Sequence, residues 1–272
     1  MDILIVSLSV LIVFALGASI GSFINVVVYR LPAKLSILWP PSRCPHCLHK
    51  LGKQENVPVL GWLWLRGRCR HCRSKISVRY PVVEAVTGLL FLIVFLKFEV
   101  SVQTLAYWTF CSWLLALSLI DLDTMTLPNP LTQSGLVAGL MFQLIAGFLP
   151  ESNWVGGFNQ LMSGIVGAVL GLWLFDSISI VGSIMLGQAA MGGGDAKLAA
   201  MLGAWLSWKY LLLSGFLACA LGAFVGGAAI ASGVLNRRQP MPFGPFLALG
   251  AVITLFGGEA IISTYLRLVL GT

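Results

Sequence analysis

Long apolar segments run through almost the whole chain and restrict it to a membrane-spanning fold. The 272 residues are 58% hydrophobic and only 10% charged, and the mean hydropathy is +0.91. A helix needs roughly 20 mostly apolar residues to cross a bilayer. About eight segments can do so: residues 4–28, 82–97, 103–120, 131–149, 159–182, 194–208, 210–233 and 244–268. This pattern excludes an ordinary soluble fold and predicts an all-α polytopic membrane protein.

The first segment and the segment 194–208 differ from ordinary spanning helices. The first could pass for a secretory signal, but no basic region precedes it and it exceeds a typical signal core. We therefore interpret residues 1–29 as a retained first transmembrane helix. The segment 194–208 is short and follows a run of glycines, which indicates a broken or tilted helix.

The basic residues indicate how the chain is oriented. Eleven of the 17 Lys and Arg residues lie between positions 30 and 79, where Glu55 is the only acid. Because cytoplasmic loops carry an excess of Lys and Arg, this segment is predicted to face the cytoplasm. Alternating crossings then place both termini outside the cytoplasm, and Lys197, Arg237 and Arg238 inside it. Topology and attraction to anionic lipid headgroups explain the net charge of +7, so we expect no nucleic-acid partner.

Residues 30–80 form the one sizeable polar insert in the sequence. It separates the first helix, residues 1–29, from an apolar region at 81–272, which predicts three domains: a transmembrane helix, a small cytoplasmic domain and a larger transmembrane domain. An insert of this length is too small for a large hydrophobic core. It therefore requires another source of stability, such as a bound metal.

The insert contains two Cys-x-x-Cys motifs separated by 21 residues. Four thiolates at this spacing can complete a tetrahedral zinc shell, and a cytoplasmic location disfavours disulfides. Since four sulfur ligands leave no open position, the predicted zinc is structural. The predicted ligands are Cys44, Cys47, Cys69 and Cys72. We expect His46, His49 and His71 to lie at the surface or just outside this shell.

Two aspartates are candidates for catalysis. Carboxylates are costly in or beside a bilayer, so those that remain there generally have a function. Asp121 ends one apolar segment, and Asp195 follows Gly192, Gly193 and Gly194 at the start of another. The predicted topology places both acids at the cytoplasmic face. Glycines without side chains let a peptide backbone approach, and a helix N-terminus favours the charge of Asp195.

If the two carboxylates meet, they share one proton. The ionised group can then take a proton from water while the protonated group polarises a peptide carbonyl, which is aspartyl proteolysis. Three alternatives stay open: the acids are helix caps, they couple ions to transport, or the chain is a non-enzymatic assembly protein. Asp123 is a weaker candidate because it points away from Asp121 on a helix, and Asp176 receives no role.

An ordered series of motifs resembles the bacterial type IV prepilin peptidases, which are bifunctional leader peptidases and N-methyltransferases. The resemblance covers most of the chain. Its motifs are Gly21–Pro32, the two cysteine pairs, Ile76–Glu84, Ile120–Asp123, Leu127-Pro128-Asn129, Gly192–Leu198 (a GxGD-type motif) and Pro242–Phe246.

This resemblance implies that Asp121 and Asp195 are the catalytic pair of an enzyme in the bacterial inner membrane. The implied substrate is a type IV prepilin or pseudopilin, cleaved after a glycine at the cytoplasmic boundary. The second implied activity methylates the new N-terminal amine with S-adenosylmethionine, and a leader peptidase without this activity is the alternative. The sequence shows no Rossmann-type cofactor motif. Glu84 is a weak candidate for cofactor binding, and alone it is better explained as a charge at a helix start.

Overall fold

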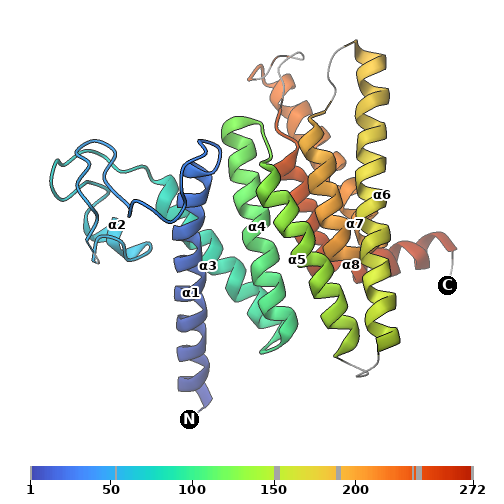
Figure 1. Cartoon of the computed structure of the whole chain (residues 1–272), viewed down its shortest axis with the longest axis horizontal. Coiled ribbons are helices and arrows are strands. Elements are labelled where there is room, and N and C mark those ends of the chain that lie inside the picture. The colour runs from blue at the N-terminus through green and yellow to red at the C-terminus, as the bar shows by residue number, and fades with distance from the viewer. Residues whose placement is uncertain are drawn as a thin grey trace. The chain divides into compact units, whose positions relative to one another are not determined.

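The computed structural model describes residues 2–52, 54–149, 154–187, 191–234, 236 and 241–270. Within them the structure contains helices, turns and two isolated β-bridges (Figure 1). Arg237 and Arg238, which contribute to the predicted charge bias, lie outside the described residues. The helices are α1 (Asp2–Arg30), α2 (Leu60–Trp64), α3 (Arg79–Phe98), α4 (Val102–Thr124), α5 (Asn129–Phe148), α6 (Trp154–Leu186), α7 (Gly193–Ala231) and α8 (Gly244–Leu270).

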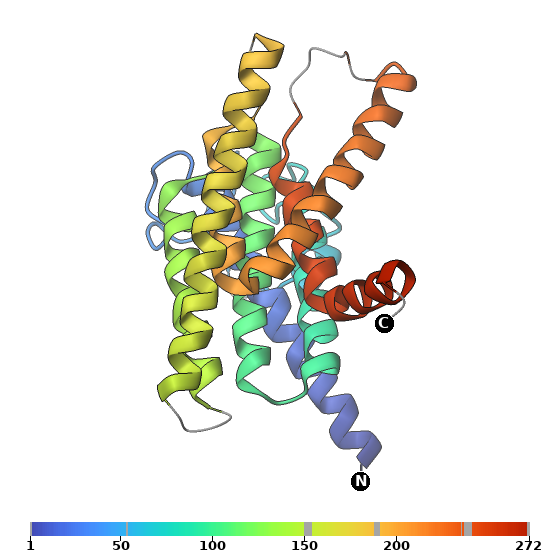
Figure 2. The same ribbon diagram turned by 90° about the vertical axis from the view of Figure 1, so that its right-hand side faces the viewer.

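Seven helices in the described part of the chain are long and apolar enough to span a membrane, which confirms an all-helical, multi-pass membrane protein. They include all the predicted segments, because α7 contains two of them. Ser207 interrupts α7 with a non-helical conformation, φ 65° and ψ 170°. Figure 2 shows α7 turning back on itself at this point. The broken helix expected near residues 194–208 is therefore present.

The chain divides into two compact units, Met1–Ala116 and Leu117–Thr272. In the first unit, α1 packs along α3. A Cβ atom added to Gly17 would lie 2.8 Å from the Cβ of Phe91, and one added to Gly21 would lie 2.7 Å from the Cα of Glu84. The Gly17/Gly21 pair is thus a small-residue seam that lets two helices approach closely, as GxxxG spacing does in membranes.

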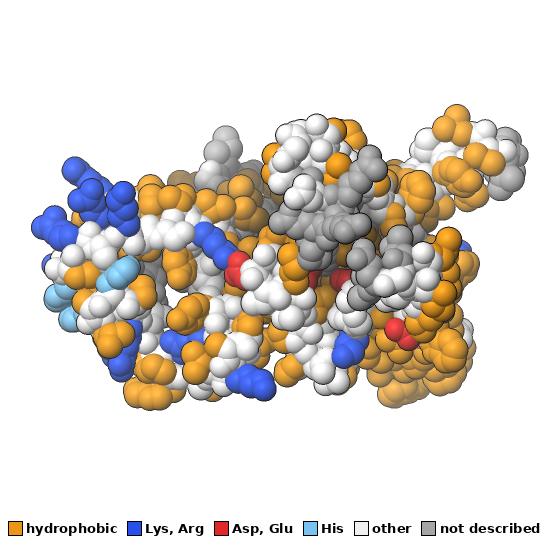
Figure 3. All heavy atoms as spheres, turned by 90° about the horizontal axis from the view of Figure 1, so that it is seen from above, with side chains coloured by type: hydrophobic (Ala, Val, Ile, Leu, Met, Phe, Trp, Pro, Cys, Tyr) orange, Lys and Arg blue, Asp and Glu red, His pale blue; other side chains and the backbone are white. Residues whose placement is uncertain are grey.

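The insert between α1 and α3 consists of turns and the short helix α2. Its exposed surface is strongly basic. Figure 3 shows Lys, Arg and His side chains gathered over this part of the chain. Among the described residues of the insert, the exposed basic ones are Lys34, Arg43, Lys50, Arg66, Arg68, Arg70, Arg73 and Lys75.

In the second unit, α7 contacts α5, α6 and α8. The part of α7 that precedes Ser207 is buried at almost every position after Gly194. Gly167 and Gly171 on α6 lie directly against the backbone of Gly203 and Ala199, so this GxxxG pair also forms a tight seam. The third such pair, Gly222/Gly226, is looser.

Both candidate aspartates belong to the second unit and lie at the same end of it. The C-terminal end of α4 and the starts of α5, α7 and α8 all lie there (Figures 1 and 2). The last turns of α6 extend past this end. Segments that are distant in sequence, around positions 121, 129, 195 and 244, are thereby brought together.

Candidate active site and metal centre

Asp195 lies in the first turn of α7, and its carboxylate is bound by the turn itself. Gly192 has extended backbone angles, φ −73° and ψ 140°, and precedes the helix as its N-cap. The N–H of Asp195 donates to the carbonyl of Gly192 at 3.0 Å, and the Asp195 carboxylate accepts a hydrogen bond from the Gly192 N–H. Asp195 thus stands three residues after the N-cap, the position from which an acidic side chain can reach back to the N-cap N–H. Asp195 is 7% exposed.

Asp121 lies in the last turn of α4, where the helix dipole disfavours a negative charge. It is nevertheless 5% exposed. Its Oδ2 accepts a hydrogen bond from the backbone N–H of Gly244 at 3.0 Å. Gly244 is the first residue of α8. The N-terminus of α8 therefore stabilises the Asp121 charge, which the C-terminus of α4 disfavours.

The carboxylates of Asp121 and Asp195 lie close enough to interact electrostatically with each other. Each one also satisfies a donor at a helix start, so the capping role expected as an alternative is present. Capping alone does not account for the arrangement, because each helix start needs one acceptor and the two carboxylates disfavour each other's charged form. Two carboxylates that come into contact can share a proton, with one group as base and the other as acid.

The three glycines before Asp195 differ in their surroundings. A Cβ on Gly194 would lie 2.9 Å from the Cβ of Leu127, which is buried. A Cβ on Gly193 would meet nothing within 4 Å, and one on Gly192 would meet Oδ2 of Asp195 at 3.7 Å. The absence of a side chain at Gly194 therefore allows close packing against Leu127 of the Leu-Pro-Asn motif. Access of a substrate past Gly192 and Gly193 stays a prediction.

A second link joins these two motifs. The Nζ of Lys197 donates to Oδ1 of Asn129 at 2.7 Å. Asn129 begins α5, directly after Pro128, whose φ of −64° and ψ of 128° end the preceding loop. The Lys197–Asn129 contact therefore connects the start of α5 with the first turn of α7, beside Asp195.

The four cysteines of the insert meet in one cluster, as their spacing predicts. All four sulfur atoms lie within 4.8 Å of one another. The Sγ atoms of Cys44 and Cys72 are 3.7 Å apart, and those of Cys47 and Cys69 are 3.9 Å apart. A tetrahedron with Zn–S bonds of about 2.3 Å has S···S edges of about 3.8 Å. The cluster can therefore hold a metal ion.

The two halves of the cluster have the same backbone geometry. The N–H of Cys44 donates to the carbonyl of His49, and that of Cys69 donates to the carbonyl of Ser74, both at 2.9 Å. The residue four positions after each first cysteine, Leu48 or Arg73, has φ 58°. Each half is thus a tight turn that points its two sulfur atoms the same way.

Local hydrogen bonds favour the thiolate form of two of the four cysteines, Cys44 and Cys72. At Cys47, a hydrogen bond from the His49 backbone is outweighed by desolvation and by the other cysteine sulfurs, which raise the pKa of the Cys47 thiol to about 11. The Cys47 backbone N–H lowers the pKa of the Cys44 thiol to about 6. The Ser74 hydroxyl, 3.0 Å from the Sγ of Cys72, lowers the pKa of that thiol. The rings of His49 and His71 contact each other, with 3.5 Å between centroids and an interplanar angle of 37°. Metal binding requires deprotonated thiols, so the lowered pKa values of Cys44 and Cys72 favour a cation, and a bound cation would displace the protons that remain.

Glu84 is buried in the first unit rather than exposed at a helix start, with 8% of its surface accessible. Its Oε2 accepts a hydrogen bond from the Val59 N–H at 2.7 Å, and the Ser22 hydroxyl lies near its carboxylate. The structure thus gives Glu84 a defined donor in the insert and a polar neighbour on α1.

Comparison with known proteins identifies the family. The model of the bacterial peptidase A24 N-terminal domain matches residues 15–98, and that of the type IV leader peptidase family matches residues 108–227. The chain belongs to the type IV leader peptidase family. No solved structure matches it.

Curated relatives in this family cover nearly the whole chain. The chain is 39% identical to the prepilin leader peptidase/N-methyltransferase of Aeromonas hydrophila, over 94% of this chain and 93% of the relative. It is 39% identical to that of Burkholderia pseudomallei (strain K96243), over 89% and 84%. It is 34% identical to that of Bacillus subtilis (strain 168), over 96% and 99%. The predicted family is thereby confirmed.

Sequence reasoning did not assign a role to several residues near the aspartates. Gly244, Asn129 and Lys197 all lie inside the motifs that carry the family resemblance, which is the signal that could have found them. Their hydrogen bonds are tertiary, so spacing along the chain does not reveal them.

Proposed function

We propose that this protein removes the leader peptide from type IV prepilins or pseudopilins and then methylates the new N-terminal amine. Membership in the type IV leader peptidase family and the names of its relatives support both activities. The observation that carries the peptidase proposal is the pair Asp121 and Asp195, held at one end of the second unit by two helix starts.

In the proposed mechanism, one carboxylate of the pair is ionised and the other holds the shared proton. The ionised group takes a proton from a water molecule, whose oxygen attacks the scissile carbonyl. The protonated group donates a hydrogen bond to that carbonyl as charge develops, and a proton then passes to the leaving amine. The donors from Gly244 and Gly192 keep both carboxylates oriented.

The location of the pair suits such a substrate. A prepilin has a basic leader in the cytoplasm and an apolar helix in the membrane, so its cleavage site lies at the boundary. We place the insert and the aspartates on the cytoplasmic side of the bacterial inner membrane, with both termini outside, because this arrangement satisfies the excess of basic residues on one side. A transporter would instead need carboxylates along a path between the two faces.

For the second activity, S-adenosylmethionine would supply a methyl group to the new N-terminal amine. A bond forms between the amine nitrogen and the methyl carbon while the S–CH₃ bond breaks. S-adenosylhomocysteine then leaves, and water takes the proton released by the amine. The chain's part is to bind the donor and present the amine. We also propose that zinc occupies the cysteine cluster as a structural ion, because four thiolates leave no position for substrate.

The test is cleavage of a purified prepilin by the full-length protein in detergent. We expect Asp121→Asn and Asp195→Asn to lower the rate by about 10²–10⁴-fold, the contribution of general acid–base catalysis. Asp123→Asn, an exposed neighbour on α4, is the matched control and should retain cleavage. Full activity in either pair variant would refute the mechanism. The mass of the product reports methylation, and an unmethylated product would refute the second activity alone.

A further inference from the structure

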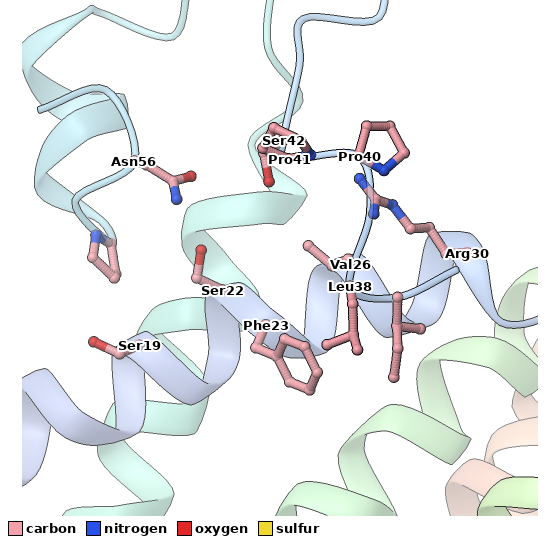
Figure 4. Close-up of a pocket in the computed structure, with 12 residues that line it drawn as sticks. Ser19, Ser22, Phe23, Val26, Arg30, Leu38, Pro40, Pro41, Ser42 and Asn56 are labelled. Carbon is pink, nitrogen blue, oxygen red and sulfur yellow. The ribbon is translucent and has the colours of Figure 1, made fainter. Parts of the chain in front are cut away.

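A hollow in the first unit lies between α1 and the loops of the insert. It has a volume of about 430 Å³, within the range of small-molecule sites. Figure 4 shows side chains from α1 on one side, and residues 40–42 and Asn56 of the insert on the other. Both walls are formed by residues 19–58, so the hollow is built entirely within this unit.

The charge on the lining selects the kind of ligand. Arg30 is the one ionisable residue among the lining side chains. Its Nη1 donates to the carbonyl of Ser36 at 3.0 Å, which holds the guanidinium in place and leaves its other N–H groups available. A guanidinium binds a carboxylate through two parallel hydrogen bonds. The ligand is therefore expected to carry an anionic group.

A buried carboxylate lies directly behind another part of the wall. Ser22 lines the hollow, and its hydroxyl lies near the Glu84 carboxylate. The N–H of Val59 donates to Glu84, and Val59 has φ 59°, which is unusual for a β-branched residue. Its surroundings hold this strained backbone where the N–H meets the carboxylate, a feature typical of functional sites. The hollow thus has a cation on its wall and an anion behind it.

The remaining lining suits a nucleoside. Phe23, Pro40 and Pro41 offer flat apolar surfaces, while Ser42 and Asn56 offer polar groups to ring nitrogens and hydroxyls. In Figure 4 the Ser22 and Ser42 hydroxyls and the Asn56 amide face the same space. A ligand with an amino-acid carboxylate, a positive centre and an adenosine matches this set.

We infer that this hollow is the binding site for S-adenosylmethionine, with Arg30 bound to its carboxylate and Glu84 compensating its positive charge. The inference rests on the proposed methyltransferase function and adds the location of the donor site. It also explains why a membrane helix retains Ser19, Ser22 and Arg30 along one side.

Equilibrium dialysis of radiolabelled S-adenosylmethionine against the full-length protein in neutral detergent tests the site. Losing a charged hydrogen-bonding partner lowers affinity by about tenfold or more, so we expect this loss in Arg30→Gln. Arg43→Gln removes an exposed charge from the same insert without touching the hollow, and should bind as the wild type does. Ser42→Trp fills the hollow and should also reduce binding. Zinc content and prepilin cleavage, measured on each variant, report whether the fold persists.

The outcomes separate the inference from the function on which it rests. If the wild type binds and methylates but Arg30→Gln and Ser42→Trp bind equally well, the site lies elsewhere and the inference is wrong. If the wild type neither binds the donor nor methylates, the methyltransferase proposal fails and the inference fails with it. If phosphatidylglycerol binds in an Arg30-dependent manner while S-adenosylmethionine binding is unchanged by the variants, the hollow is a lipid site.

Discussion

The backbone N–H of Gly244 reaches Oδ2 of Asp121 at 3.0 Å because Gly244 has no side chain. A Cβ at this position would lie 2.7 Å from the same oxygen, closer than such atoms approach in proteins. The start of α8 therefore depends on a glycine to orient an acid on α4, more than 100 positions earlier in the sequence.

Gly244→Ala should reduce prepilin cleavage by about 10–100-fold. The added methyl group displaces the Asp121 carboxylate and weakens a charged hydrogen bond that contributes about 1.5–3 kcal/mol. Cleavage rates at saturating prepilin measure the effect. Gly227→Ala on α7 is the control, because a Cβ there meets nothing within 4 Å. Equal rates for the two variants would show that the Gly244 contact does not position the acid.

The sequence predicted the aspartates and their common membrane face, but not the groups that orient them. Apolar segment lengths and basic residues set the number of crossings, and alternation then places Asp121 and Asp195 at one end. The Gly244 contact depends on how α8 packs against α4, and no periodicity encodes that. The three glycines before Asp195 look equivalent in the sequence, but only the tertiary structure shows that Gly194 packs against Leu127 while its neighbours do not.

Lys197 and Asn129 should act as one unit. Their 2.7 Å hydrogen bond joins the starts of α7 and α5, so removing either partner loosens the turn that carries Asp195. We expect Lys197→Met and Asn129→Ala each to lower cleavage by about 3–10-fold, corresponding to a hydrogen bond of about 0.5–1.5 kcal/mol. In a double-mutant cycle, the combined variant should be no worse than the more affected single variant. Additive losses would indicate that the contact has no role in activity.

The break in α7 shows a second limit of sequence reasoning. The short apolar segment and the glycine run indicate a broken helix, but not the means by which the break is tolerated. Gln143 on α5 is 3% exposed. Its Nε2 donates to the carbonyl of Trp205 at 3.1 Å and to Oγ of Ser207 at 3.0 Å. Backbone groups freed from a helix inside a membrane need such partners.

Gln143→Leu should therefore destabilise the protein by about 1–3 kcal/mol, because a buried carbonyl loses its donor. Denaturant titration in mixed micelles, followed by circular dichroism, measures the change. Gln133→Leu, at an exposed position of the same helix, should leave stability nearly unchanged. Prepilin cleavage should fall in Gln143→Leu only to the extent that the folded fraction falls. An unaltered unfolding transition would mean that water or another group provides hydrogen bonds to the backbone groups at the break.

Metal removal should loosen the insert and leave the helices intact. Two tight turns and the five-residue helix α2 provide little core, so the four cysteine sulfurs are the main constraint on this segment. We expect about one zinc per chain by elemental analysis, lost in Cys44→Ser and retained in Cys219→Ser, which changes an exposed cysteine on α7. Limited trypsin digestion should then cut Cys44→Ser, or chelator-treated protein, faster within residues 30–79. If Cys44→Ser keeps its zinc, or if zinc-free protein resists trypsin as the wild type does, the cysteine cluster does not stabilise the insert through a metal.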